Sequence, residues 1–129
     1  MLYHCYLIWK IYFKKNKLMK NKRYCFTLDL KNNKHLISEY IDYHKKVWPE
    51  IIQSIRNSGI NSMEIYNVSN RLFMIAEVSD DFTLESKKKL DQNNPKVQEW
   101  ENLMWKYQKA LPFAEEGEKW VLMNSIFKI

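Results

Sequence analysis

The sequence predicts one α+β domain whose elements follow the order β-α-β-β-α-β. Two observations lead to this order. Four segments show the apolar alternation or the continuous apolar run of β-strands, and two regions between them repeat apolar residues every three or four positions, as amphipathic helices do. The chain of 129 residues is close to the usual size of one domain and leaves little for a second hydrophobic core.

The first strand is predicted over residues 23–30, RYCFTLDL. Successive side chains of a strand point to opposite faces, and here a bulky apolar residue alternates with a small or polar one. We therefore expect a half-buried strand. Its buried side would hold Tyr24, Phe26, Leu28 and Leu30.

An amphipathic helix is predicted over residues 35–58, because isoleucines recur there at spacings of three and four and Gly59 follows the last of them. Proline lacks a backbone donor and clashes with the preceding turn, so Pro49 must kink this helix or split it in two. The same apolar stripe contains a histidine, His44, which a purely structural helix does not require.

The rest of the chain supplies a hairpin, a second helical region and a last strand. Residues 61–68 and 71–78 flank a short Ser-Asn turn and predict the hairpin. Residues 80–111 predict one or two helices, with Pro95 at a position where a first helical turn tolerates proline. Residues 120–127, WVLMNSIF, predict the closing strand.

This order is the ferredoxin-like plan, an antiparallel sheet with helices on one face. The other face of a single sheet needs cover, and dimerisation is the usual solution. Two such sheets packed face to face make a dimeric α+β barrel. We therefore expect a homodimer, and the apolar C-terminal strand is a candidate for exchange between the subunits.

Residues 1–18 are predicted to be a leader upstream of the true start at Met19, so that residues 19–129 form the single domain. The apolar run of the leader is shorter than the roughly 20 residues that a bilayer span needs, and its positive charges follow the run instead of preceding it. An interfacial membrane anchor is the alternative. We expect no membrane partner and a cytoplasmic location, where a chain with two cysteines stays reduced.

The charge distribution argues against nucleic acid as a partner. The formal net charge is +6, but residues 1–23 hold seven of the 21 basic side chains and no acidic one, which leaves 14 basic against 15 acidic side chains. A nucleic-acid groove would need basic side chains interleaved with aromatics inside the folded part. The run Lys87, Lys88 and Lys89 is more simply a solvated helix face.

His44 is the one histidine of three that lies in an apolar stripe. On a helix Tyr40, His44 and Trp48 are each four residues apart and share a face. One interpretation is a structural histidine whose ring nitrogens are satisfied by neighbours, with the aromatics as packing. The other is proton transfer to a small neutral ligand that the aromatics hold.

Other chemistries lack the residues they need. No second histidine or cysteine stands at ligand spacing, so no metal is expected. Gly59 and Gly117 are the only glycines and cannot build a phosphate-binding loop. Cys25 lies in mid-strand without an evident base beside it. We therefore expect no cofactor.

The stretch EYIDYHKKVWPEI, residues 39–51, resembles the E-Y-x-x-x-H-x-x-x-W-P-E signature of the L-rhamnose mutarotase family. The resemblance extends through NSGINSMEIY, NRLFMIAEV and the closing IF, and covers most of residues 22–129. Within the family, KRYCFTLDL, NPKVQEWENLMWKYQ and GEKWVLM are more similar to the L-fucose branch. The resemblance implies a dimeric α+β barrel and cofactor-free interconversion of the α and β anomers of a 6-deoxyhexose.

The resemblance also implies roles for individual residues. The general acid of the family falls on His44, and its second sugar-binding tyrosine aligns with Met63. Its adjacent tryptophan pair is not adjacent here, so the choice between L-fucose and L-rhamnose stays open, as does the choice of partner base among Glu50, Glu64 and Glu101. The implied substrate-binding residues are Tyr40, Met63, Trp100, Trp105 and Trp48.

Two other functions are compatible with the fold class. One is a small-molecule oxygenase or haem-degrading domain, in which a histidine binds iron or a tryptophan positions a substrate. The other is a non-catalytic dimeric binding module in which His44 is structural.

Overall fold

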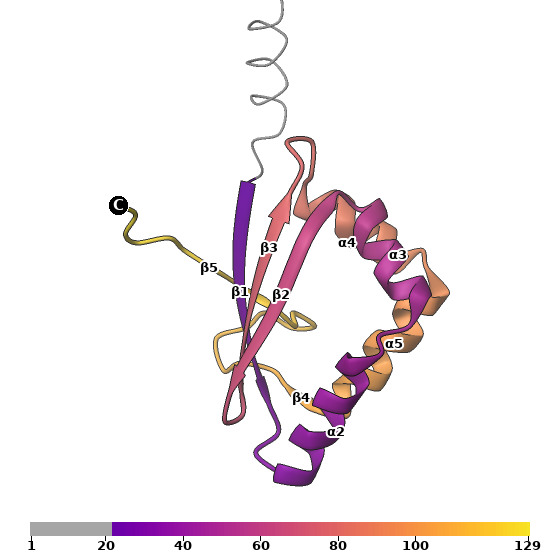
Figure 1. Ribbon diagram of the computed structural model, residues 1–129, viewed down its shortest axis with the longest axis vertical. Helices are drawn as coiled ribbons and strands as arrows, with labels where there is room; N and C mark the ends of the chain where they lie inside the picture. Colours follow the sequence, from indigo (N-terminus) through magenta and orange to yellow (C-terminus); the bar gives the residue numbers. More distant parts are fainter. Residues whose placement is uncertain (1–21) are drawn as a thin grey trace, which may run out of the picture.

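Figure 1 shows the computed structural model, which describes residues 22–129. A single antiparallel sheet has all its helices on one side. The predicted leader, residues 1–18, lies outside the described residues. The strands are β1 Lys22–Leu30, β2 Ile60–Val68, β3 Arg71–Val78, β4 Gln108–Lys109 and β5 Val121–Met123, and the helices are α2 Lys34–Lys45, α3 Pro49–Asn57, α4 Leu84–Gln92 and α5 Pro95–Trp105.

The strand order β2-β3-β1-β4, with β5 also paired to β1, confirms the predicted α+β class. β1 lies inside the sheet because it pairs with β3 along one edge and with β4 and β5 along the other. The alternation of β1 sets the register, since Leu28 pairs with Leu72 and Phe26 with Met74, so that apolar side chains share the face under the helices.

The predicted first helix is split at Pro49, as its sequence required. Asn33 caps α2 by accepting a hydrogen bond from the backbone of Leu36 at 3.0 Å, and Pro49 occupies the first turn of α3, where its missing donor costs nothing. On either side of the split, α2 buries Tyr40 and α3 buries Ile51 in the same hydrophobic cluster.

The second helical region is also two helices. Asn94 caps α5, with its side chain accepting from the backbone of Lys96 at 3.1 Å, and Pro95 follows it in the first turn. α4 buries no residue, whereas α5 buries Trp100 and Met104. Of the two helices, α5 therefore contributes the residues of the core.

Buried apolar residues form two clusters under the helices, one near each end of the sheet. The helix cluster contains the aromatic side chains of α2 and α5, and the hairpin cluster lies where β2 begins and β3 ends. The helix cluster is Leu30, Tyr40, Ile51, Leu72, Val97, Trp100, Met104 and Tyr107, and the hairpin cluster is Ile60, Ala76, Val78 and Phe82.

The predicted strand over residues 120–127 is too long, because only Val121–Met123 pairs with β1. Beyond Met123 the polar pair Asn124 and Ser125 interrupts the apolar pattern, and the chain runs away from the sheet (Figure 1). Ile126 and Phe127 are 96% and 81% exposed, so these apolar side chains do not pack on the described residues 22–129.

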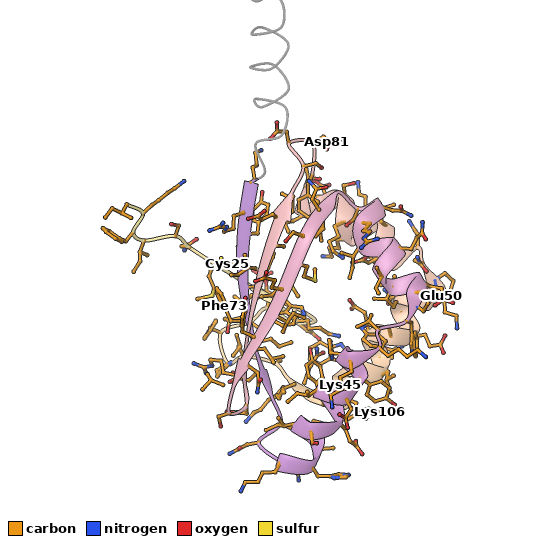
Figure 2. The ribbon with its side chains drawn as sticks, viewed as in Figure 1. Cys25, Lys45, Glu50, Phe73, Asp81 and Lys106 are labelled. Atoms are coloured by element: carbon orange, nitrogen blue, oxygen red, sulfur yellow. The ribbon has the colours of Figure 1, made fainter. Side chains whose placement is uncertain are left out.

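The face of the sheet that points away from the helices carries the alternate side chains of each strand. Cys25 and Phe73, labelled in Figure 2, lie on this face and are half-buried. Ion pairs flank the face, Arg23 with Glu77 at 3.1 Å and Arg71 with Asp29 at 2.8 Å. No element of the described residues covers it, which agrees with the expectation that this face needs a partner.

Candidate active site

His44 lies in the last turn of α2, one turn after Tyr40. Its Nδ1 is 2.8 Å from the backbone oxygen of Tyr40, and the two rings stack with their centroids 4.3 Å apart. A carbonyl oxygen can only accept, so Nδ1 must donate its hydrogen. This bond fixes the tautomer and leaves Nε2 of the neutral ring with its lone pair available.

Burial lowers the pKa of His44, and the hydrogen bond to the Tyr40 backbone opposes this shift only in part. The imidazole is therefore neutral at pH 7. A neutral imidazole can accept a proton at Nε2 and return it, which is the behaviour of an acid–base catalyst.

Trp100 of α5 supplies the wall beside His44. The two rings meet edge to face with centroids 5.8 Å apart, and Trp48 packs on Trp100 at 5.0 Å. Tyr43 contacts the same indole at 6.2 Å. Edge-to-face packing of this kind holds each ring in a defined orientation. Of the tryptophans implied by the sequence, Trp100 and Trp48 thus belong to the surroundings of His44.

Trp105 lies elsewhere. Its ring is covered by Lys119, whose Nζ is 4.7 Å from the ring centroid and donates to the backbone oxygen of Glu101 at 3.1 Å. Burial lowers the pKa of Lys119, with the charge of Glu101 opposing the shift. Among the described residues Trp105 has no ring contact with His44. This indole therefore belongs to a separate polar group formed by Glu101, Trp105 and Lys119.

Met63 lies on β2 opposite Ala76 and packs against the hairpin cluster. It is on the helix-covered face of the sheet, but none of the contacts of His44 involves it. The structure thus brings Tyr40, Trp48 and Trp100 together around His44 and leaves Met63 and Trp105 outside this group.

Tyr40 is 3% exposed, and its hydroxyl accepts a hydrogen bond from Nε2 of Gln108 at 3.3 Å. Burial raises the pKa of Tyr40 to about 12, so the phenol stays neutral. Sequence reasoning missed Gln108. The available signal was weak: a single amide between Tyr107 and Leu111, in a segment that was expected to be helical.

A cavity of about 660 Å³ opens beside Tyr43 and Trp48, and His44 is not among its lining residues. Tyr107 reaches it and hydrogen-bonds to Glu39 and Tyr43, while burial, as the largest cause, raises its pKa to about 12. Of the residues predicted for the site, Trp48 alone lines this cavity. The lining is Glu39, Asp42, Tyr43, Lys46, Val47, Trp48, Pro49 and Tyr107.

The three carboxylates left open as partner base have different positions. Glu50 is exposed at the outer surface of α3 (Figure 2), and Glu64 is exposed on β2, where it accepts from the hydroxyl of Tyr66. Glu101 is half-buried beside Lys119. None of the three contacts His44.

Metal and membrane features were searched over the described residues. Across residues 22–129 no group of three or more histidine, cysteine, aspartate or glutamate side chains is close enough to hold a metal ion. No helix within this part of the chain is long and apolar enough to cross a membrane.

The fold and the neutral histidine among aromatic rings define a small α+β domain suited to proton transfer on an uncharged ligand. A family model described as L-rhamnose mutarotase matches residues 23–129. An L-fucose mutarotase of Xanthomonas campestris pv. campestris is 39% identical over 113 residues, which cover 86% of this chain and 90% of the relative. The chain belongs to the L-rhamnose mutarotase family, whose members are isomerases that interconvert sugar anomers.

Three further proteins are similar to this chain in sequence or in fold. A UPF0734 protein of Dictyostelium discoideum is 38% identical over 112 residues, 84% of this chain and 90% of the relative. A crystal structure of L-rhamnose mutarotase from Formosa agariphila superposes with a TM-score of 0.63 at 22% identity, covering 84% of this chain and 98% of that chain. Tetracenomycin F2 cyclase from Streptomyces glaucescens shares the fold with a TM-score of 0.50 at 16% identity, covering 84% and 96%.

The comparisons do not favour the two other functions, an oxygenase or haem-degrading domain and a non-catalytic binding module. The matching family model covers residues 23–129, and the relative at 39% identity is an L-fucose mutarotase.

Proposed function

We propose that this protein interconverts the α and β anomers of a 6-deoxyhexose, with L-fucose preferred over L-rhamnose, and that His44 is its acid–base catalyst. The observation that carries the proposal is the 2.8 Å bond from His44 Nδ1 to the Tyr40 backbone, which presents Nε2 as a base inside an aromatic wall. The preference for L-fucose is supported by the relative at 39% identity.

Ring opening of a cyclic sugar moves one proton. The anomeric hydroxyl loses its proton as the aldehyde forms, and the ring oxygen gains a proton as its bond to the anomeric carbon breaks. Both oxygens are bonded to the same carbon, so one Nε2 can take the first proton and deliver it to the ring oxygen. Rotation of the open-chain aldehyde and the reverse transfer give the other anomer, and His44 returns to its neutral form.

The remaining residues of the group bind the sugar. Tyr40 stays neutral and can orient a hydroxyl, and Trp100 and Trp48 offer flat apolar surfaces to the C–H face of a pyranose. We propose Trp100 in preference to Trp105 as the contact nearest the reacting carbon, because Trp100 touches His44. The uncatalysed reaction already proceeds, so roughly 10²- to 10⁴-fold from a positioned histidine is sufficient.

We further propose that the protein is a cytoplasmic homodimer. Tyr66 and Val68 on the uncovered sheet face are 54% and 73% exposed, and the apolar side chains Ile126 and Phe127 beyond Met123 are exposed on the described part of the chain. A second copy facing this sheet and exchanging the tail would cover both. Within residues 22–129 Cys25, on the same face, has no disulfide partner, which fits a reducing compartment.

The dimer has its own test. Val68→Asp is expected to yield monomers in size-exclusion chromatography with light scattering, because it places a charge on the sheet face that the second copy would cover. Leu90→Asp is the matched control, since Leu90 is 50% exposed on α4, on the helix side. A monomeric parent protein, or a dimer that tolerates Val68→Asp, contradicts this arrangement.

The function is tested by saturation-transfer NMR between the α and β anomer signals of L-fucose and of L-rhamnose. Exchange faster than buffer is expected with the parent protein and should be lost with His44→Ala. His35→Ala is the control, because His35 is an exposed histidine of the same helix, paired with Glu39 at 3.0 Å. A folded parent protein that accelerates neither sugar would refute the proposal.

A further inference from the structure

We propose that Gln108 is a further substrate-binding residue, whose Oε1 accepts a hydrogen bond from one sugar hydroxyl while its Nε2 positions Tyr40. The inference rests on the proposed function and deepens it. It adds a residue that neither the sequence pattern nor the family resemblance indicates.

Gln108 belongs to the two-residue strand β4 and pairs with Leu30 at the end of β1. This pairing directs its side chain into the helix cluster. It is 4% exposed and is the one polar side chain that is buried among residues 22–129. A glutamine in such a place replaces an apolar residue that would pack without polar atoms, and this suggests that the amide has a role beyond packing.

The hydrogen bonds of this amide are incomplete. Nε2 donates to the Tyr40 hydroxyl at 3.3 Å, but Oε1 has no partner among the described residues. A buried carbonyl oxygen without a donor loses its hydration and gains nothing in return. Solvent does not reach this atom, and a trapped water or a donor that a ligand carries inward would supply the missing hydrogen bond.

The neighbouring phenol of Tyr40 has a hydrogen-bond donor without an acceptor. Because Nε2 of Gln108 donates to the Tyr40 oxygen, the phenol's own hydrogen points elsewhere, and burial keeps the phenol protonated. An unused donor and an unused acceptor thus lie side by side. A sugar hydroxyl accepts and donates at once and satisfies both, whereas a carboxylate cannot donate to Oε1 and an ammonium group cannot accept from Tyr40.

The pair formed by Tyr40 and Gln108 lies next to His44. The Tyr40 ring that ends in this hydroxyl stacks on His44 at 4.3 Å, so a hydroxyl held by the pair anchors the sugar beside the imidazole. Gln108 acts partly through Tyr40 and partly by direct contact. A site with buried polar groups rejects a ligand that lacks the matching hydroxyl, because the groups then stay unpaired.

The experiment compares Gln108→Leu with the parent protein on L-fucose and on its 2-, 3- and 4-deoxy analogues, by anomer exchange. The parent is expected to lose roughly 10- to 100-fold in kcat/KM on one analogue. Gln108→Leu is expected to lose a similar factor in kcat/KM on L-fucose. Its kcat/KM on that analogue should be no lower than that of the parent protein on the same analogue. The control is Gln98→Leu, which removes a glutamine that bonds to the backbone of Asp91 at 2.9 Å and should leave discrimination unchanged.

A second readout separates binding from folding. Replacing an unpaired buried amide by an apolar side chain of similar shape is expected to leave the urea midpoint unchanged or to raise it, while kcat/KM falls. If Gln108→Leu does not fold, Gln108→Asn shortens the side chain by one methylene and is expected to lose the same discrimination through a higher KM. Tyr40→Phe combined with Gln108→Leu should cost less than the two single changes together.

Two results would overturn the inference. If Gln108→Leu, or Gln108→Asn where leucine does not fold, keeps both the L-fucose rate and the discrimination against every analogue, Oε1 holds only a trapped water and the proposed function stands without it. If the parent protein exchanges neither sugar, the proposed function itself is wrong and the role of Gln108 falls with it.

Discussion

The two clusters under the helices differ in chemistry although they share one sheet. The helix cluster contains Tyr40, Trp100 and Tyr107, whose rings end in polar atoms, and it contacts His44. The hairpin cluster consists of Ile60, Ala76, Val78 and Phe82 and contains no polar side chain. Polar tips in a buried place need partners, so they generate hydrogen bonds and shifted pKa values, while purely apolar atoms contribute burial alone.

This difference teaches where function and stability are to be found. A change in the hairpin cluster removes apolar contacts and is expected to alter the free energy of unfolding, with the chemistry intact. A change in the group around His44 is expected to alter the reaction, with modest effects on folding. Each prediction below tests one side of this comparison.

The largest effect is expected for His44→Gln. The amide keeps the approximate shape of the side chain but cannot exchange a proton at neutral pH, so kcat should fall by roughly 10²- to 10⁴-fold. The measurement is anomer exchange by NMR, with urea unfolding as the stability readout. If the loss of activity only parallels a loss of folded protein, His44 contributes to stability like the hairpin cluster and is not a catalyst.

Phe82→Ala is the counterpart in the hairpin cluster. Phe82 is 6% exposed and packs where β2 begins, and truncating a buried phenylalanine costs about 3–5 kcal/mol. We expect a lower urea midpoint and an unchanged kcat at temperatures where the variant stays folded. A fall in kcat without a change in the urea midpoint would show that Phe82 contributes to the reaction instead of to stability.

Gly59→Ala tests the turn that leads into the hairpin cluster. Gly59 has φ +96°, and an added Cβ would lie 2.8 Å from the Ser79 hydroxyl oxygen, so both the backbone and the contact oppose a side chain. A destabilisation of about 1–3 kcal/mol is expected in urea unfolding, again without a change in KM. Gly117→Ala, with nothing within 4 Å of its added Cβ, is the control for positive φ alone.

The matched pair Trp100→Phe and Trp105→Phe sharpens the placement of the sugar. A phenyl ring loses part of the flat surface of an indole, so Trp100→Phe should raise KM for L-fucose roughly three- to tenfold. Trp105 faces Lys119 instead of His44, and its replacement should leave KM within about twofold. A larger rise in KM for Trp105→Phe than for Trp100→Phe would place the sugar beside Glu101 and Lys119 instead.

The smallest effect expected near neutral pH is the change of kcat/KM with pH. Because burial lowers the pKa of His44, kcat/KM should be flat above neutral pH and fall, by up to about tenfold per pH unit, once the pH drops below that pKa. The unfolded chain binds this proton more readily, so the free energy of unfolding should also fall below about pH 6.5. Activity that instead rises on acidification would mean that the imidazolium is the resting form.

Much of the fold could be predicted because its signals are local. The alternation over residues 23–30, the hairpin turn and the split at Pro49 follow from φ/ψ preferences and side-chain periodicity, which act over a few residues. The closing strand was predicted too long, because only Val121–Met123 pairs with β1 and the polar pair Asn124 and Ser125 follows it.

The candidate site divides in the same way. Tyr40 and His44 share α2, so their spacing predicted that they would contact each other. The prediction that Trp48 continues the same helix was wrong, because α2 ends at Lys45 and Trp48 is the N-cap of α3. Trp100 could be proposed only from the family resemblance, and Gln108 was missed, because its partner Tyr40 is 68 positions away in the chain. The family resemblance also implied Met63 and Trp105 as substrate-binding residues, and the structure places both outside the contacts of His44.

The sequence by itself determined the element order, the break at Pro49, the helix face that holds Tyr40 and His44, and the family resemblance, since each depends on neighbours within a turn or a strand. The tertiary structure decided which tryptophan meets His44, which amide meets Tyr40, and that the imidazole is neutral. These depend on β1, β4, α2 and α5 packing together, because burial and contacts between distant segments exist only once the chain has folded.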